Sequence, residues 1–431
     1  MMNGKAPKAV SVDHALSDRR ILRRNYFLHA VEGGLYMGGL QFVAPQTVLP
    51  RMVDVLGGSA WMIALMPVAT LMGMSLPGLF VAHRIERLQR VKPMILCTGI
   101  FQRVPFLLAA LALLHMWQVL PSLTLAFCFA APLVSGLAGG VAFAAWQELL
   151  TKTLPEERRS SVFAIRYIIT SVIGLSSGGS IAAILHLVPG APGYGYLYLC
   201  AFLFMALSYL LFTLLVEPPH PPHHNGPPVT LLENLRRMPR ALHASYHLPR
   251  FVVGHMLSCG FYVMLPFFAI HALHVTGQPD SFLGFLVAAQ MIGAVVGNVA
   301  AGYCGDRWGG KVPTLGSMVV LLAVCVSAPP CRTDWGFLAL FGILGAGMYA
   351  WRIGMMTLRL ELCPAANRAT ALSVAGLCFG AAMLVAALLS ALLWHWTGSF
   401  ALLCTVAGLL LAAAGALFIK LREPRKRAPT S

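Results

Sequence analysis

The stretch "GYCGDRWGGK", residues 302–311, places Asp306 next to Arg307 between glycines in a chain that is 58% hydrophobic. It is one of the short charged segments that interrupt an otherwise apolar sequence. Only 11% of the 431 residues are charged, whereas soluble domains contain roughly 25%. The mean hydropathy is +0.74. This composition excludes an ordinary water-soluble protein and indicates a membrane protein.

Apolar stretches that approach or exceed the ~20 residues needed to cross a bilayer recur along the whole chain. We predict an all-α membrane protein with twelve transmembrane helices. The predicted spans are residues 25–50, 59–82, 93–116, 121–150, 160–186, 195–216, 249–274, 281–305, 312–329, 335–362, 368–393 and 398–420.

The lysines and arginines are distributed unevenly between the two sides of the predicted membrane. Of 31 such residues, 27 fall on one side, in the tails, in the segments between alternate spans or near the adjoining ends of those spans, among them Arg166, six residues into the fifth span. The other four are Arg51 and Arg332 in opposite loops, and Arg103 and Arg352 inside spans. By the positive-inside rule, both termini are cytoplasmic. The net charge of +16 therefore indicates a membrane topology, not a nucleic-acid partner, and we expect location in a bacterial inner membrane.

A proline- and histidine-rich segment divides the twelve spans into two sets of six. It begins "EPPHPPHH" at residue 217. His220, His223 and His224 invite a metal-site interpretation, but no cysteine or carboxylate cluster accompanies them, so we interpret the segment as a linker and expect no metal and no cofactor. The predicted units are a tail (1–24), a first bundle (25–216), a linker (217–248), a second bundle (249–420) and a tail (421–431).

The two halves repeat each other's charged segments. "GLFVAHRIERLQR" (78–90) follows the second span as 302–311 follows the eighth, and "KTLPEERR" (152–159) follows the fourth as "ELCPAANR" (361–368) follows the tenth. Two like-oriented copies of a six-helix unit form a parallel repeat, which predicts a binding site at mid-membrane between the copies.

The sequence resembles the major facilitator superfamily of secondary transporters. Its signature loop, G-x-x-x-D-R-x-G-x-K/R, is matched by residues 302–311, whereas the first copy has Ala82 and His83 where Asp-Arg would stand. The family pattern E-x6-R is intact at 361–368, but its first-half counterpart begins with Lys152. The resemblance implies two six-helix bundles with pseudo-twofold symmetry and transport by alternating access. It also implies a cytoplasmic gate, for which we predict Gly302, Asp306, Arg307, Lys311, Glu361 and Arg368.

Charged residues inside spans are costly in a bilayer and so call for a partner or a function. Glu32 and Arg103 lie at similar depths in the first and third spans, which predicts an ion pair between them. Three roles are open for this pair: proton coupling, a structural clamp of the first bundle, or direct contact with the substrate.

Other polar residues in the spans are candidates for the substrate cavity. Arg352 in the tenth span favours an anionic or amphipathic solute, although it can also reach back to the interface. Gln290 and Asn298 share one face of the eighth span and offer hydrogen bonds to the cavity or to other helices. The predicted cavity residues are His29, Tyr36, Gln290, Asn298, Tyr349 and Arg352.

The predicted function is secondary transport of a small solute by a monomer, with protons as one candidate coupling ion. The sequence contains no nucleotide-binding loop and no hydrolase or metalloprotease motif, so we do not expect an enzyme. The alternatives are efflux of a hydrophobic compound, or a membrane enzyme or sensor on the same scaffold. "GLSSGG" (174–179) resembles the antiporter signature of drug exporters, but Leu175 stands where that signature has proline, so we interpret the segment as a site of close helix packing.

Overall fold

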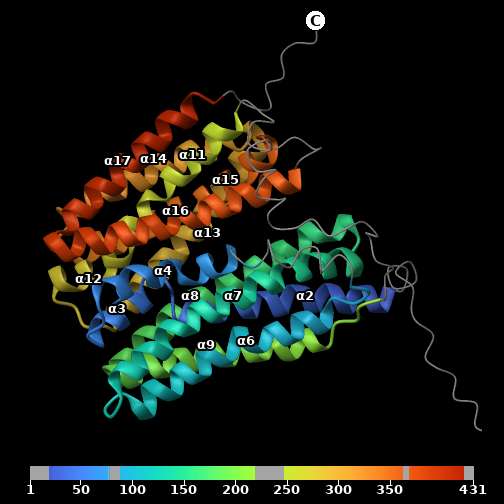
Figure 1. Ribbon diagram of the computed structural model, residues 1–431, viewed down its shortest axis with the longest axis horizontal. Coiled ribbons are helices and arrows are strands. Elements are labelled where there is room, and N and C mark those ends of the chain that lie inside the picture. The colour runs from blue at the N-terminus through green and yellow to red at the C-terminus, as the bar shows by residue number, and fades with distance from the viewer. Residues whose placement is uncertain (1–18, 76, 78–87, 219–246, 363–367, 422–431) are drawn as a thin grey trace, which may run out of the picture.

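The computed structural model describes residues 19–75, 77, 88–218, 247–362 and 368–421, and within them every regular element is helical (Figure 1). The proline-histidine tract and most of the first charged loop, including Ala82 and His83, lie outside the described residues. Arg368 begins a helix, but its side chain is also outside the description.

Within its described residues, the first half contains six long helices and three short elements. The long helices are α2 (Arg19–Gly39), α4 (Ala60–Ser75), α6 (Lys92–Leu111), α7 (Pro121–Thr153), α8 (Glu156–Leu187) and α9 (Ala191–Thr213). The short elements are a 3-10 turn η1 (Leu40–Phe42), the helix α3 (Val48–Val55) and a π-helical turn η2 (Ala112–Met116).

The second half repeats this series, and its first span is divided into α11, η3 and α12. The elements are α11 (Leu248–Ser258), η3 (Cys259–Val263), α12 (Leu265–Thr276), α13 (Phe282–Trp308), α14 (Lys311–Ser327), α15 (Asp334–Leu362), α16 (Arg368–Thr397) and α17 (Phe400–Ile419). Pro266, near the start of α12, has no N–H for a bond to the preceding turn, which accounts for the 3-10 segment before it.

Nine helical segments of the described chain are long and apolar enough to cross a membrane. The apolar helices α4 and α14 are shorter, with 16 and 17 residues, and α2 has four arginines and Glu32 among its residues. Together these segments fit the twelve predicted spans, and the all-α fold class is confirmed.

The helices of the two halves pack in the same pattern. In the first half α6 contacts α7 and α9, α4 contacts α7, and α2 contacts α8 and α9. The same contacts recur in the second half between α14 and α15 or α17, between α13 and α15, and between α11 and α16 or α17. This correspondence is the pseudo-twofold repeat that the sequence predicted.

Glycines allow the closest helix crossings within each half. A Cβ on Gly136 would meet the backbone of Thr70, which brings α7 against α4. In the second half a Cβ on Gly293 would meet the carbonyl of Gly342, and one on Gly345 would meet the carbonyl of Gln290. Small residues at such positions let membrane helices approach backbone to backbone.

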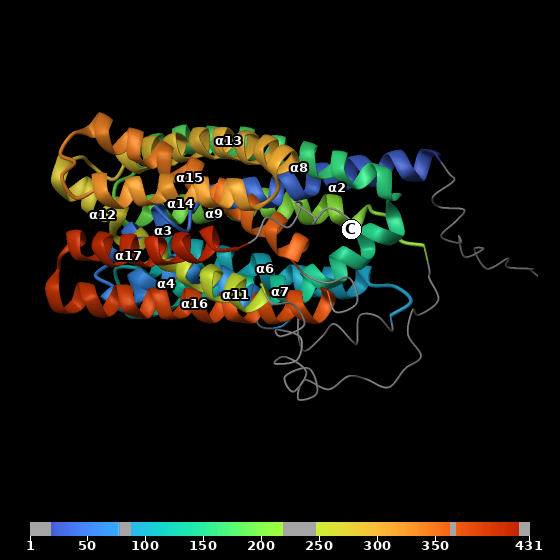
Figure 2. The same cartoon turned by 90° about the horizontal axis from the view of Figure 1, so that it is seen from above.

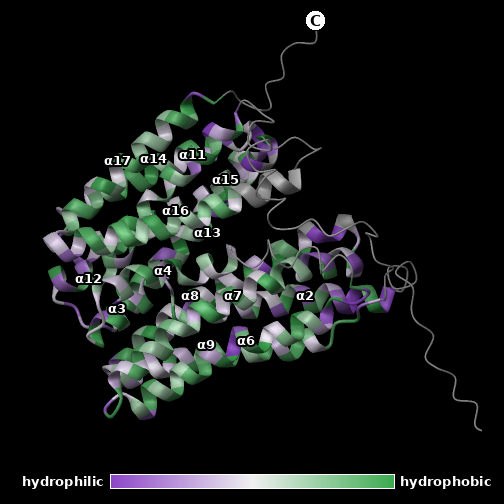
Figure 3. Ribbon diagram, in the orientation of Figure 1, coloured by the Kyte–Doolittle hydropathy of each residue, from purple (hydrophilic) through white to green (hydrophobic). Residues whose placement is uncertain are grey.

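The two halves form two groups of helices that meet near α3, α4 and α12 and diverge toward the other end (Figure 1). We call the end at which α2 begins and α17 ends the tail end, and the end that holds α3 and α12 the distal end. The halves contact each other mainly through α8 with α13 and α4 with α16. Figure 2 shows that the long helices run roughly parallel to one long axis, and Figure 3 shows apolar residues along their lengths and hydrophilic residues gathered at the tail end.

Candidate functional site

A buried ion pair lies inside the first half, between α2 and α8. Arg166 Nη1 lies 3.5 Å from Glu32 Oε1, and the exposed fractions of the two side chains are 13% and 6%. Gly33 makes this contact sterically feasible, because a Cβ there would collide with the Arg166 guanidinium. The position next to Glu32 therefore requires a residue without a side chain.

The arginine that we predicted as the partner, Arg103, binds elsewhere. From α6 it donates to the carbonyl of Met205 on α9 at 2.6 Å and to the carbonyl of Gly99 at 2.9 Å. Its guanidinium also lies 5.3 Å from the ring of Tyr36 and 5.0 Å from that of Tyr209. Arg103 remains within electrostatic range of Glu32, so the first half encloses one carboxylate between two guanidinium groups.

The difference has a simple geometric origin. We counted Arg166 among the cytoplasmic bases because its span was expected to begin at residue 160, but α8 begins at Glu156. Arg166 is thus ten residues into the helix, or about 15 Å at helical rise. It reaches the depth of Glu32 on a helix that packs directly against α2.

Aromatic rings line the other side of Arg166. The ring of Trp146 on α7 lies 4.8 Å from the guanidinium carbon. Phe143 stacks on Trp146 at 5.9 Å, and Phe163 meets it edge-on at 5.8 Å. A cation against an aromatic face gains electrostatic energy when water is excluded, so this wall holds Arg166 near Glu32.

His29 and Tyr36, predicted for the cavity, both contact residues of the first half. His29 is fully buried, and its Nε2 lies 2.9 Å from Thr153 Oγ1. Tyr36 is half-buried under Arg103. His29 therefore helps to join α2 to α7, and Tyr36 belongs to the surroundings of the charged cluster.

In the second half, Arg352 lies in the middle of α15 and is exposed in the isolated chain. It is within electrostatic range of Tyr262 and Tyr349, and Tyr349 is in turn within range of Tyr167 on α8. The interaction with Tyr167 places Tyr349 on the side of α15 that faces the first half, and Arg352 lies about one helical turn further along the same helix.

Gln290 joins the two halves. It is buried, it accepts a hydrogen bond from Thr47 Oγ1 at 3.1 Å, and its amide nitrogen lies 3.9 Å from Met348 Sδ. Asn298, two turns further along α13, is half-buried. Gln290 thus bonds between helices, one of the two alternatives that the sequence left open.

A polar cluster that the sequence analysis did not predict connects the halves at the distal end. Asp280, between α12 and α13, accepts from Arg51 Nε on α3 and from Tyr194 Oη on α9, each at 2.9 Å. Arg51 also pairs with Asp54 at 2.6 Å. Burial lowers the pKa of Arg51, but the Asp280 carboxylate more than offsets this, so the pKa is raised and the residue stays charged. The sequence analysis placed only two bases, Arg51 among them, in the loops on the side opposite the termini. This rarity was the one signal in the sequence that pointed to the cluster.

The glycine-rich segment of α8 reinforces the same junction. A Cβ on Gly178 would lie 2.7 Å from the carbonyl oxygen of Gly284 on α13, and a Cβ on Gly284 would meet the backbone of Gly178 and Ala182. Gly179, one residue on, has open space around it. Residues 174–179 are therefore a site of close packing between the halves, as predicted.

The predicted gate residues of the second half lie at the tail end and join helices of that half. Glu361 Oε2 accepts from the backbone N–H of Gly310 at 3.0 Å, directly before α14. Lys311 donates to the carbonyls of Ile419 and Leu421 at the end of α17. Gly309 has a φ of 84°, which explains the glycine that the signature requires.

Three further predicted gate residues, Gly302, Asp306 and Arg307, lie on the last turns of α13. Asp306 and Arg307 are both exposed, and Arg307 donates to the hydroxyl of Tyr303 at 3.0 Å. Gly302 has open space around it. The hydrogen bond of Arg307 to Tyr303 is therefore a contact within α13.

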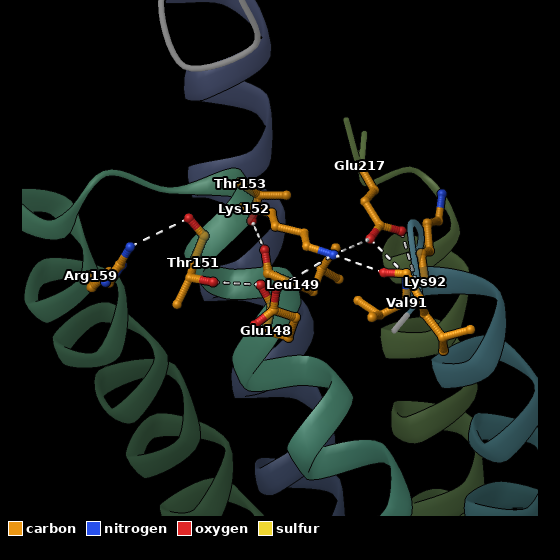
Figure 4. A network of polar contacts seen from close by, with 10 residues as sticks. Val91, Lys92, Glu148, Leu149, Thr151, Lys152, Thr153, Arg159 and Glu217 are labelled. Atoms are coloured by element: carbon orange, nitrogen blue, oxygen red, sulfur yellow. Dashed lines mark hydrogen bonds and ion pairs between the residues drawn. The ribbon is translucent and has the colours of Figure 1, made fainter. Parts of the chain in front are cut away.

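The first half contains a rearranged copy of this tail-end arrangement (Figure 4). Lys92 donates to the carbonyls of Thr213 and Leu215, as Lys311 does to those of α17. Lys152 stands where the second half has Glu361, and Glu217 supplies the carboxylate instead, accepting from the N–H groups of Val91 and Lys92 at 2.7 and 2.8 Å. Lys152 Nζ lies 3.9 Å from Glu217 and 3.5 Å from Glu148. The start of α6 thus keeps a carboxylate cap although the family pattern has lost its acid.

Residues 250–431 match the family model of the Major Facilitator Superfamily. The sequence matches none of the curated proteins. Among solved structures, the nucleoside transporter NupG is 12% identical with a TM-score of 0.68, over 91% of this chain and 98% of that one. A bacterial homologue of the iron transporter ferroportin, in an inward-facing state, is 14% identical with a TM-score of 0.66, over 94% and 99%. A D-xylose-proton symporter is 13% identical with a TM-score of 0.62, over 95% and 98%. At these identities the likeness extends to the fold alone.

Proposed function

We propose, on the premise that this chain is a protein of the Major Facilitator Superfamily, that it is a secondary transporter that moves a small solute by alternating access. The observation that supports this most strongly is the position of the contacts between halves. Arg51 and Tyr194 with Asp280, Gly178 with Gly284, and Thr47 with Gln290 all involve the distal half of the spans. A protein whose halves are joined at one end occupies one of the two states that alternating access requires.

The charge distribution orients this state in the membrane. By the positive-inside rule the tail end faces the cytoplasm of a bacterial inner membrane, so the solute pathway is open to the cytoplasm and closed outside. We propose the bundle bounds of 25–216 and 249–420 as the two moving bodies. A single copy contains both, so the transporter acts as a monomer.

Glu32 is the proposed proton carrier. Its carboxylate is the acid buried among Arg166 and Arg103 in the first half, and taking up a proton would weaken its attraction to Arg166. Release of Arg166 frees a guanidinium group for an anionic solute, which would couple proton and solute movement through one ion pair. Arg352 and Tyr349, on the facing side of the second half, provide the other wall of the proposed site.

The test is transport by the purified protein in lipid vesicles, screened over anionic, zwitterionic and neutral solutes with and without an imposed pH gradient. We expect the gradient to drive accumulation of a solute by the wild type. Glu32→Gln is expected to abolish this accumulation. The exchange of solute that is measured without an imposed gradient should persist in this variant. Asp334→Asn, which changes a carboxylate at the start of α15 outside this ion pair and outside the tail-end cluster, is the control and should behave as the wild type. Gradient-driven transport that survives Glu32→Gln would remove proton coupling from this residue, and a wild type that moves no solute would refute the function.

The specificity arm of the same assay uses Arg352. If Arg352 contacts an anionic group, Arg352→Gln should raise the KM of anionic solutes at least about tenfold, since hydrogen bonds to charged groups contribute ~1.5–3 kcal/mol. The KM of neutral solutes should hardly change, and Arg352→Lys should retain part of the preference. Equal losses for anionic and neutral solutes would show that Arg352 has a structural role.

A further inference from the structure

We propose that a basic pocket at the tail end, between α2 and α8, binds a phosphate group carried by a membrane phospholipid or by a soluble phosphate ester. The pocket has a volume of about 520 Å³ and is lined by Arg19, Leu22, Arg23, Tyr26 and Arg158. Its lining residues all precede Glu32 or Arg166 along α2 and α8, so the pocket lies nearer the tail end than the proposed solute site.

The packing of α2 on α8 forms this pocket. The two helices touch closely further along, where a Cβ on Gly34 would collide with Ile169 and one on Gly38 with Ile173. Nearer the tail end, Tyr26 Oη donates to Ser161 Oγ at 2.9 Å and closes the gap between the helices. Arg19, Arg23 and Arg158 all precede this hydrogen bond along their helices, so the pocket opens from it toward the tail end.

The arginines of the pocket differ from their neighbours in what they bind. Arg24 donates to the carbonyl of Leu214 at 2.7 Å, and Arg159 to that of Leu154 at 3.2 Å. Arg19, Arg23 and Arg158 are exposed, and no hydrogen bond or ion pair joins their guanidinium groups to another residue in the ranges that the structure describes. Three guanidinium groups are therefore available around one space.

A phosphate group is the ligand that best matches three guanidinium groups around one pocket. The planar guanidinium presents paired N–H donors that match phosphate oxygens, and more than one arginine can bind the same group. The pocket lies where the apolar helices end, at the level of lipid headgroups, and Leu22 adds an apolar wall. Basic pockets between helices at the cytoplasmic face are a recurrent form of anionic headgroup site.

The test compares two double variants that remove the same charge from the tail end. Arg23→Gln with Arg158→Gln takes one arginine from each wall of the pocket, whereas Arg90→Gln with Lys420→Gln removes exposed bases elsewhere. Bound lipid is counted by native mass spectrometry after exchange into detergent with phosphatidylglycerol or phosphatidylcholine, and glycerol phosphate is the soluble competitor. We expect wild type and control to bind phosphatidylglycerol at least about tenfold more tightly than phosphatidylcholine, and the pocket variant to lose this preference.

The competitor distinguishes the two sources of phosphate. If glycerol phosphate displaces the lipid from the wild type at similar concentration, a soluble phosphate ester suffices as ligand; if only phosphatidylglycerol competes, the acyl chains contribute and the ligand is the lipid. Arg23→Lys with Arg158→Lys keeps the charge and should keep part of the preference, which separates loss of binding from misfolding. A pocket variant that binds phosphatidylglycerol as tightly as the control would overturn the proposal, as would a wild type without a preference.

Discussion

Replacing Arg166 by glutamine is expected to lower the free energy of unfolding by about 3–5 kcal/mol, because it leaves the buried carboxylate of Glu32 without its nearest positive charge. The two side chains are 3.5 Å apart and almost wholly buried. Within a bilayer the carboxylate has no water to replace the guanidinium. Unfolding of the purified protein in detergent, followed through its helical content, measures the change.

A double-mutant cycle separates this pair from its surroundings. Glu32→Gln removes the carboxylate that Arg166→Gln leaves unpaired. The decrease in the free energy of unfolding caused by Arg166→Gln should therefore largely disappear in the double variant. The matched cycle uses Arg103, which lies within electrostatic range of Glu32 but donates hydrogen bonds to the carbonyls of Met205 on α9 and Gly99 on α6. We expect a smaller coupling energy for Glu32 with Arg103. Simple additivity of Glu32→Gln and Arg166→Gln would contradict the assignment of the pair.

Replacing Gly178 by leucine is expected to prevent the halves from closing at the distal end. The new Cβ would meet the carbonyl oxygen of Gly284 and atoms of Ala288, and backbone that is held in a helix cannot move aside cheaply. Overpacking of this kind costs ~1–3 kcal/mol. Because only the distally closed state carries this cost, its population relative to the other state should fall about 5- to 150-fold, and solute transport in vesicles should fall with it.

Gly179→Leu is the matched control, one residue away on the same helix, where a Cβ meets nothing within 4 Å. It should transport as the wild type does. The accessibility of a label at the distal end, measured with a membrane-impermeant reagent, should rise for Gly178→Leu and stay unchanged for Gly179→Leu. If the two leucines have the same effect, contact of α8 with α13 does not decide the state of the protein.

The bilayer made the helices predictable. Each span must satisfy its backbone internally and present an apolar surface, so apolar runs of the right length indicate a helix with little ambiguity. The signature segment was recognisable for a similar reason: Gly309, Lys311 and Glu361 each have a defined local role, namely a positive φ, a bond to the end of α17 and a cap before α14.

Contacts between helices were less predictable, because they depend on which faces meet. Glu32 has arginines at similar depth on two helices, and only the packing of α2 on α8 selects Arg166 as the direct partner. The distal cluster joins Arg51, Tyr194 and Asp280, which lie far apart in sequence and carry no motif. The exchange of a family acid for Lys152 was visible in the sequence, but its compensation by Glu217 from the end of α9 required the three-dimensional structure.

The most direct test of two bodies alternating around a shared pathway is a pair of distances measured by pulsed electron paramagnetic resonance in vesicles. Spin labels at Ser59 and His274 span the halves at the distal end, and labels at Arg90 and Trp308 span them at the tail end; all four positions are exposed. The labels are placed in a protein from which the ten native cysteines have been removed. When solute and a pH gradient shift the state, the distal distance should lengthen while the tail-end distance shortens. Two distances that stay fixed, or that change in the same direction, would contradict alternating access in this protein.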